Sequence, residues 1–140
     1  MRELAMDYLS RREHTRVELQ RKLMLKGYAE SEIEGVLDRL QSQGLQNDQR
    51  FVNSFLEQRM RMGNGPMKIR AELNQHGVCS QLVDDVFAAV AVNWCEVAKQ
   101  LWLQKFKEPP EDIKEKMRRH RFMLQRGFNY EHFKALESSS

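Results

Sequence analysis

The stretch KLMLKGY at residues 22–28 decides the fold, because a run of helix-forming side chains ends there at a glycine followed by an aromatic residue. Glycine is common just past a helix end, where its missing Cβ lets the backbone turn left-handed at little cost. The same pattern occurs in ELNQHGV at residues 72–78 and FMLQRGF at residues 122–128. The glycines lie 50 residues apart, which predicts three copies of one helical unit with corners at Gly27, Gly77 and Gly127.

Apolar side chains repeat with the same period on both sides of each glycine. Leu19 and Leu23 precede the first glycine four residues apart, and therefore on one helical face, and Ile69 and Leu73 match them in the second unit. After the glycines, the matching pairs are Ile33 and Val36, Val83 and Val86, and Phe133 and Leu136. Two apolar helix faces are therefore expected to meet at each corner.

A further helix is expected before each of these pairs, over residues 4–12, 48–62 and 94–106. The sequence thus predicts an all-α protein of three tandem three-helix repeats, which form one elongated, curved helical array. The predicted repeats are residues 1–46, 47–92 and 93–140.

Residues at the expected helix starts agree with this division. Thr15 followed by Glu18 is a capping box that opens the second helix of the first unit. Gly65 and Pro66 occupy the aligned position in the second unit, where proline is favourable as the first helical residue. Two asparagines are expected to cap the first helices of the second and third units, namely Asn47 and Asn93.

The third unit departs from the pattern. Arg119 occupies the position of Leu19 and Ile69, so this helix cannot bury the same face in the same way unless it is rotated or longer. Pro109 and Pro110 are expected to mark its start, which makes the helix over residues 110–125 the longest of its class.

Composition excludes several classes of protein. With 41% apolar and 31% charged residues, no stretch approaches the apolar length of a membrane span, and the charged opening MRELAMDYLSRRE is unlike a secretory signal. A cytoplasmic protein is expected. Cys79 and Cys95 are interpreted as small buried structural residues in a reducing compartment.

The sequence shows no pattern typical of an enzyme. GNGP at residues 63–66 lacks the Gly-Lys-Ser/Thr of a phosphate-binding loop and is interpreted as a loop between helices. His76 and Cys79 have a ligand-like separation, but they are only two residues where four ligands are usual. No catalytic residue, cofactor or metal is predicted.

Basic residues form two candidate binding segments. The formal charge is only +3, and all of the excess lies in the last third of the chain. The helix containing KEKMRRHR supplies six candidates for contact with phosphates or an acidic protein surface: Lys114, Lys116, Arg118, Arg119, Arg121 and Arg126. The alternative is a solvated face with Ile113, Met117, Met123 and Leu124 turned inward.

The second segment, RMRMGNGPMKIR, surrounds a Gly-Pro hinge at residues 59–70. Its basic candidates are Arg59, Arg61, Lys68 and Arg70. Met60, Met62 and Met67 offer pliable apolar surface that suits a protein interface, or they lie in the core. Trp94 and Trp102, eight residues apart on one helix, are interpreted as packing anchors.

The central unit resembles the RecX family of regulatory proteins. The family pattern of Arg-Phe, Arg-x-x-x-Gly-x-Gly-Pro and Ile-Arg-x-Glu-Leu before a helix-ending glycine is met by Arg50, Phe51, Arg59, Gly63, Gly65, Pro66, Ile69, Arg70, Glu72, Leu73 and Gly77. REHTRVELQRKL, NWCEVA and RFMLQRGF are similar to the family's first and third repeats. The resemblance covers almost the whole chain.

The resemblance implies a regulator of the RecA recombinase, and hence a role in DNA recombination, DNA repair and the SOS response. Family members bind in the groove of the RecA filament on single-stranded DNA and depress its ATPase, strand-exchange and coprotease activities. A monomer whose DNA contact is at most weak and non-specific is expected. Two alternatives remain open: a direct DNA-binding protein with helix-turn-helix-like units, and a repeat scaffold for another protein.

Overall fold

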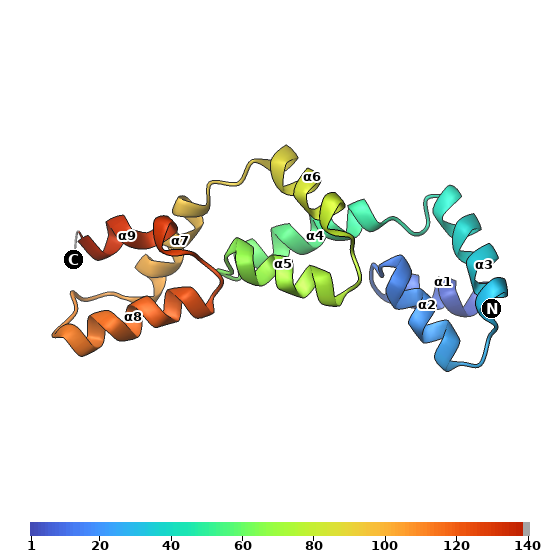
Figure 1. The fold of residues 1–140 in the computed structure, drawn as a ribbon, viewed down its shortest axis with the longest axis horizontal. Helices are drawn as coiled ribbons and strands as arrows, with labels where there is room; N and C mark the ends of the chain where they lie inside the picture. Colours follow the sequence, from blue (N-terminus) through green and yellow to red (C-terminus); the bar gives the residue numbers. More distant parts are fainter. Residues whose placement is uncertain (139–140) are drawn as a thin grey trace. The chain divides into compact units, whose positions relative to one another are not determined.

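The computed structural model describes residues 1–138 (Figure 1), and within that range the chain forms nine helices and no strand. The helices of the first repeat are α1 (Arg2–Arg11), α2 (Arg16–Leu25) and α3 (Glu30–Ser42). Those of the second are α4 (Asp48–Arg61), α5 (Pro66–Gln75) and α6 (Ser80–Val90). Those of the third are α7 (Trp94–Lys105), α8 (Ile113–Gln125) and α9 (Tyr130–Ser138).

The prediction of an all-α protein built from three-helix repeats is therefore confirmed. The repeat limits at residues 46 and 92 remain a proposal, and residues 139 and 140 of the third repeat lie outside the described range. By its contacts the chain forms two compact units, which differ from the three repeats. The first contains residues 1–55 and 73–86, and the second contains residues 56–72 and everything from residue 87 onward.

The three glycine corners have the predicted left-handed backbone, with φ of 94° at Gly27, 82° at Gly77 and 94° at Gly127. At the first corner, the Gly27 N–H donates to the carbonyl of Met24 (3.0 Å) and the Tyr28 N–H to that of Leu23 (3.3 Å). The other two corners repeat both bonds at positions 50 and 100 residues later. This paired pattern satisfies the last helix carbonyls and explains why glycine recurs at each corner.

Each terminal repeat has its own apolar core. The first is built from Ala5, Leu19, Leu23, Ile33, Leu37 and Leu40. It forms where α2 packs against α1 and α3. The other core is built from Ala98, Leu101, Trp102, Met123, Phe128 and Phe133. It forms where α9 packs against α7 and α8. Trp102 is buried and Trp94 packs against this cluster, as predicted for packing anchors.

The predicted helix starts are confirmed in the first two repeats. The Glu18 N–H donates to Thr15 Oγ1 (3.1 Å) and the Thr15 N–H donates to Glu18 Oε1 (3.1 Å), which completes the capping box. Pro66 is the first residue of α5. The two asparagine caps also form, at Arg50 N to Asn47 Oδ1 (3.0 Å) and Glu96 N to Asn93 Oδ1 (3.1 Å).

Two sequence predictions are wrong. The prolines do not start α8, because Asp112 is its N-cap and Asp112 Oδ1 accepts the Glu115 N–H at 2.9 Å. A carboxylate at this position satisfies a free N–H of the first turn, which proline cannot do. Cys79 and Cys95 are exposed free thiols rather than buried residues, because they lie at the solvent-facing starts of α6 and α7.

Within the first unit, the corner of the second repeat packs against the start of α2. Thr15 Oγ1 donates to the carbonyl of His76 at 2.6 Å. A Cβ placed on Gly77 would lie only 2.5 Å from Val17 Cβ. Gly77 is therefore needed here for close packing as well as for its backbone conformation.

The second unit contains the equivalent junction 50 residues later. The Gly65 N–H donates to the carbonyl of Arg126 (2.6 Å) and the Met67 N–H to that of Gly127 (3.0 Å). A Cβ on Gly65 would lie 2.4 Å from the Gly127 carbonyl carbon. In both junctions a donor at the start of the repeat's second helix meets the carbonyl that precedes the next corner glycine.

No helix among residues 1–138 combines the length and the apolar character that crossing a membrane requires.

Candidate partner-binding surface

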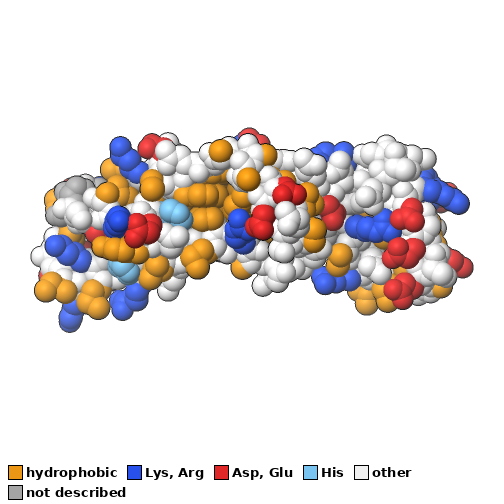
Figure 2. All heavy atoms as spheres, turned by 45° about the horizontal axis from the view of Figure 1, so that its top comes forward, with side chains coloured by type: hydrophobic (Ala, Val, Ile, Leu, Met, Phe, Trp, Pro, Cys, Tyr) orange, Lys and Arg blue, Asp and Glu red, His pale blue; other side chains and the backbone are white. Residues whose placement is uncertain are grey.

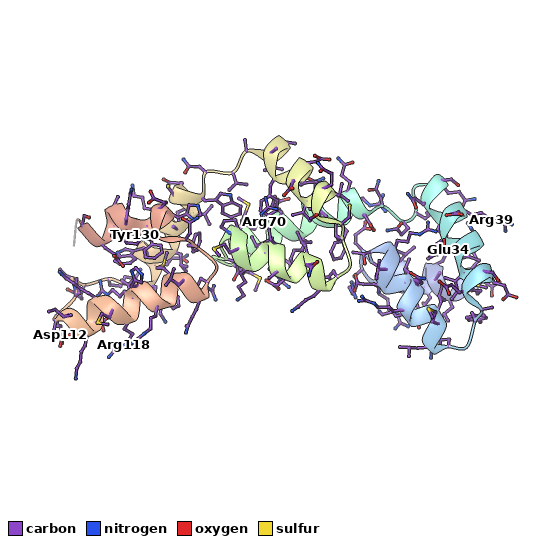
Figure 3. All side chains as sticks on the ribbon, viewed as in Figure 1. Glu34, Arg39, Arg70, Asp112, Arg118 and Tyr130 are labelled. Atoms are coloured by element: carbon purple, nitrogen blue, oxygen red, sulfur yellow. The ribbon has the colours of Figure 1, made fainter. Side chains whose placement is uncertain are left out.

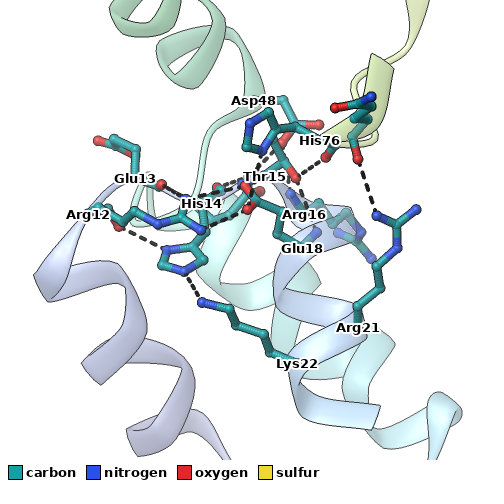
Figure 4. Close-up of polar contacts among 12 residues, drawn as sticks. Arg12, Glu13, His14, Thr15, Arg16, Glu18, Arg21, Lys22, Asp48 and His76 are labelled. Atoms are coloured by element: carbon teal, nitrogen blue, oxygen red, sulfur yellow. Dashed lines mark hydrogen bonds and ion pairs between the residues drawn. The ribbon is translucent and has the colours of Figure 1, made fainter. Parts of the chain in front are cut away.

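The polar cluster at the first junction is structural (Figure 4). Glu18 Oε2 lies 2.8 Å from Arg12 Nη2 and 3.4 Å from His76 Nδ1. Burial opposes ionisation of Glu18, but the hydrogen bonds from Arg12 and from the Thr15 N–H outweigh it and lower its pKa from 4.5 to about 2. Glu18 is thus an ionised internal partner rather than a proton donor for catalysis.

His14, in the same cluster, is buried. Its Nδ1 lies 3.0 Å from the Arg12 carbonyl and its Nε2 lies 2.8 Å from Lys22 Nζ. Burial lowers the pKa of His14. These contacts fit a neutral imidazole whose Nδ1–H donates to the carbonyl and whose Nε2 accepts from the ammonium group. Both ring nitrogens are therefore used within the fold.

Among residues 1–138, no group of three or more His, Cys, Asp or Glu side chains is arranged to hold a metal ion. A cleft of about 500 Å³ lies within the second unit, with Met60, Val90 and Leu101 in its lining. Arg61 also lines this cleft but pairs with Glu57. Such a lining suits an apolar side chain better than a phosphate-bearing cofactor.

The four candidates of the Arg59 to Arg70 segment lie in different environments. Arg59 Nε pairs with Glu72 Oε2 at 3.2 Å and so links α4 to α5. Arg61 is exposed and pairs with Glu57 one turn earlier. The stem of Lys68 packs against the corner at Gly127. Arg70 is exposed on α5 (Figure 3), with its guanidinium 4.4 Å from the centre of the Phe87 ring.

The methionines of this segment are not core residues as a group. Met62 and Met67 are exposed, whereas Met60 is half-buried beside the cleft. The alternative that places these methionines in the core is therefore wrong for Met62 and Met67. The exposed pair leaves pliable apolar surface close to Arg61 and Lys68 in the sequence.

Two of the six basic candidates of the third repeat contact residues outside α8. Arg119 is only 6% exposed, donates from Nη2 to the Glu108 carbonyl (2.8 Å) and lies 4.6 Å from the centre of the Phe106 ring. Arg126 donates to the carbonyls of Met62 and Gly63. Arg119 thus replaces the aliphatic side chain of the other repeats with a buried, hydrogen-bonded cation stacked on an aromatic ring.

The other four basic candidates are exposed on α8, namely Lys114, Lys116, Arg118 and Arg121. Arg118 pairs with Glu115 at 2.7 Å and points away from α9 (Figure 3). The structure therefore brings Lys114, Arg118 and Arg121 to one outward side of a single helix. This surface can attract phosphates or an acidic protein surface within about 8–10 Å in ordinary salt.

Sequence reasoning missed the apolar side chains on the same surface. Of the four residues that the alternative interpretation turns inward, only Met123 is buried, while Ile113 is 75%, Met117 55% and Leu124 45% exposed. Blue and orange side chains lie next to one another along the lower left of Figure 2, in the region of α8 in Figure 1. The alignment of the repeats could have predicted that Leu124 is exposed, because it aligns with Met24 and Asn74, which are both exposed.

Comparison with known proteins identifies all three repeats. Family models for the first, second and third three-helix domains of RecX match residues 2–40, 47–86 and 94–136. A protein named "Regulatory protein RecX" from Pseudomonas syringae pv. tomato is 44% identical over 129 residues, which are 91% of this chain and 83% of the relative. A protein of the same name from Chromohalobacter salexigens is 37% identical over 130 residues, which are 93% and 86% of the two chains.

Solved structures share the fold. A crystal structure of regulatory protein RecX superimposes with a TM-score of 0.79 at 23% identity and covers 98% of this chain and 71% of that one. A crystal structure of RecX from Lactobacillus salivarius has a TM-score of 0.79 at 20% identity, with 99% and 92% covered.

Proposed function

Because the chain belongs to the RecX family of regulatory proteins, we propose that it is a non-catalytic regulator of the RecA recombinase. It binds in the groove of the RecA filament on single-stranded DNA and inhibits the ATPase, strand-exchange and coprotease activities of RecA. It acts in the cytoplasm as a monomer, without a cofactor, and touches DNA weakly at most.

The exposed cations of α8 support this proposal most directly. A nucleoprotein filament presents both phosphates and carboxylates, and clustered Lys and Arg side chains attract either. Exposed Arg61 and Arg70 add to the proposed contact, whereas Arg59, Arg119 and Arg126 hold the fold together through their internal contacts.

A pull-down tests the binding. RecA filaments assembled on single-stranded DNA are expected to capture the protein, and free RecA is expected to capture less. Addition of the protein is expected to lower the DNA-dependent ATPase rate of RecA. Equal capture by free RecA would contradict binding to the assembled filament, and no capture by either form would contradict the proposed function.

The variant Lys114→Ala/Arg118→Ala/Arg121→Ala tests the role of α8. It keeps Arg119, whose loss would disturb the core. The concentration needed for half-inhibition of the RecA ATPase is expected to rise roughly five- to tenfold, because three screened charge contacts are lost. The circular dichroism spectrum should stay helical.

The matched control is Lys99→Ala/Lys107→Ala/Lys134→Ala, which removes the same charge from exposed positions outside α8. Its inhibition curve is expected to stay within twofold of the parent's. Equal effects of the two triple variants would mean that net charge, rather than α8, determines inhibition.

Direct DNA binding is a second candidate function. Lys114, Lys116 and Arg121 are exposed and form no ion pair among residues 1–138, so they could neutralise phosphates without help from RecA. A salt titration on duplex DNA discriminates between the two functions. Tight binding with a steep salt slope favours this candidate, and weak binding favours the regulator.

A further inference from the structure

The outward side of α8 carries two parallel rows of side chains. The apolar row has spacings of four and seven residues and consists of Ile113, Met117 and Leu124. The cationic row lies about 100° further around the helix and consists of Lys114, Arg118 and Arg121. An apolar row flanked by charge is typical of a helix face that docks against another amphipathic helix.

The aligned segment contacts the next repeat in the other two repeats. Met117 lies 50 residues after Met67 and 100 after Val17. Val17 packs at the corner formed by Gly77, and the Met67 N–H donates to the carbonyl of Gly127. In the first repeat the next corner packs against the side chain at this position, whereas in the second it binds the backbone N–H of Met67 and leaves the side chain exposed. In the third repeat the side chain of Met117 is exposed and, among residues 1–138, no further corner lies against the start of α8, so this surface aligns with the segment through which the first two repeats contact the next one.

A further corner of the same kind cannot dock on α8. Thr15 Oγ1 and the Gly65 N–H are the donors that bind the incoming carbonyl in the first two repeats. Their counterpart is Glu115, whose N–H already donates to Asp112 Oδ1. Any molecule that covers this face must therefore bind through the side chains of the two rows, which argues against a second copy of this chain.

We propose that the outward side of α8 docks an amphipathic helix of a partner protein, with an apolar stripe that is flanked by Asp and Glu. The apolar row is buried against that stripe and the cationic row pairs with the carboxylates. Nucleic acid phosphates would satisfy the cations but leave the apolar row in water. This inference rests on the proposed function, in which the RecA filament supplies the helix.

The internal contacts of Arg119 prepare α8 for this role. Its hydrogen bond to the Glu108 carbonyl and its ion pair with Glu115 (3.2 Å) hold the start of α8 against the preceding loop. Met123 buries the opposite side of the helix. A helix fixed in this way presents both rows without further ordering, which lowers the entropic cost of binding.

The variant Met117→Ser/Leu124→Ser tests the inference. Its affinity for RecA filaments on single-stranded DNA, measured by co-sedimentation, is expected to fall at least tenfold, because two side chains lose their apolar burial in the complex. The control Met24→Ser/Leu103→Ser removes a methionine and a leucine of similar exposure from α2 and α7 and is expected to bind within twofold of the parent. Thermal midpoints check that both variants fold.

Three outcomes overturn the inference. The first is that Met117→Ser/Leu124→Ser binds filaments as tightly as the parent does. The second is that its affinity for oligo(dT) without RecA falls by as much as its affinity for filaments. The third is binding of the parent to phosphatidylglycerol vesicles that this variant loses while its filament affinity is unchanged. Capture of the parent by filaments tests the proposed function separately, so a parent that binds and an apolar variant that binds equally well refute only the docked helix.

Discussion

At the scale of single residues, Gly27 and Gly77 separate two effects of one methyl group. Both have a left-handed backbone, but a Cβ on Gly27 would have no neighbour within 4 Å, whereas one on Gly77 would lie 2.5 Å from Val17 Cβ. Substitution of Gly27 by alanine therefore measures the energetic cost of the left-handed backbone alone. Substitution of Gly77 by alanine measures that cost together with the cost of the steric clash between two closely packed repeats.

We predict that Gly27→Ala lowers the free energy of unfolding by about 1 kcal/mol, the cost of a left-handed residue that carries a Cβ. Gly77→Ala is expected to lower it by about 2–4 kcal/mol, because overpacking adds to that cost. Urea unfolding of both variants and the parent provides the measurement. Equal losses would show that the corner at Gly77 shifts away from Val17 at no cost.

Glu18 predicts a specific sensitivity to acid. Its folded-state pKa of about 2 lies below its ordinary value of 4.5, so its contribution is complete above about pH 4.5 and is lost as the pH falls towards 2. Between pH 5 and pH 2 the parent should lose up to about 3 kcal/mol more unfolding free energy than Glu18→Gln. Denaturant unfolding at several pH values measures this difference.

His14 provides an internal comparison for that experiment. Its pKa is also lowered, so its contribution is complete above about pH 6.5 and declines at lower pH in both proteins. A parent and a Glu18→Gln variant with parallel pH profiles below pH 4.5 would contradict the assigned role of Glu18.

Single residues also show where sequence reasoning stops. Arg119 was recognised as a departure from the repeat, but a basic side chain in a charged run looks exposed until its partners are known. Its partners are the Glu108 carbonyl and the Phe106 ring, which come from the loop before α8 and from the end of α7. Periodicity does not specify such contacts, because they depend on how the loop folds.

At the scale of helices, the sequence predicted well which segments are helical. It predicted the first residue of α8 poorly. Caps at Thr15, Asn47 and Asn93 are local signals, and each forms as expected. The prolines at 109 and 110 predict an earlier start of α8 than the structure shows, because the carboxylate of Asp112 caps the helix. The carboxylate succeeds because its oxygen satisfies the Glu115 N–H.

The junction between α5 and the third repeat yields a prediction for Gly65. A Cβ there would meet backbone atoms of the next corner, with Gly127 C at 2.4 Å and Phe128 N at 2.5 Å. Backbone cannot move aside as a side chain can, so Gly65→Ala is expected to cost on the order of 2–4 kcal/mol. Differential scanning calorimetry gives the loss in thermal stability.

Gly35→Ala is the matched control for that variant. Gly35 lies within α3, is exposed, and its added Cβ would have no neighbour within 4 Å. Alanine is the better helix former, so this variant is expected to gain roughly 0.5–1 kcal/mol. A Gly65→Ala protein that is as stable as Gly35→Ala would refute the close approach at the second junction.

At the scale of the whole molecule, the 50-residue period was sufficient to predict the class and the repeat, because three glycine corners and their apolar pairs recur in the sequence itself. The junctions were not predictable in the same way. Position 15 donates from a threonine side chain and position 65 from a glycine backbone, so one interaction is encoded by two unlike residues. The binding face of α8 was half-predicted, through its charges but not its apolar row.

The capped start of α8 has a consequence for how such proteins could lengthen. Tandem duplication is the simplest route to a longer chain. A fourth module placed after the third could not bind the start of α8 in the same way, because the Glu115 N–H already donates to Asp112 Oδ1. A further corner of the same kind would require α8 to begin three residues later, at the position aligned with the starts of α2 and α5, and would require residue 115 to keep a free donor. Local chemistry at this helix end therefore hinders the docking of a further corner of the same kind, and the outward surface of α8 stays available for another molecule.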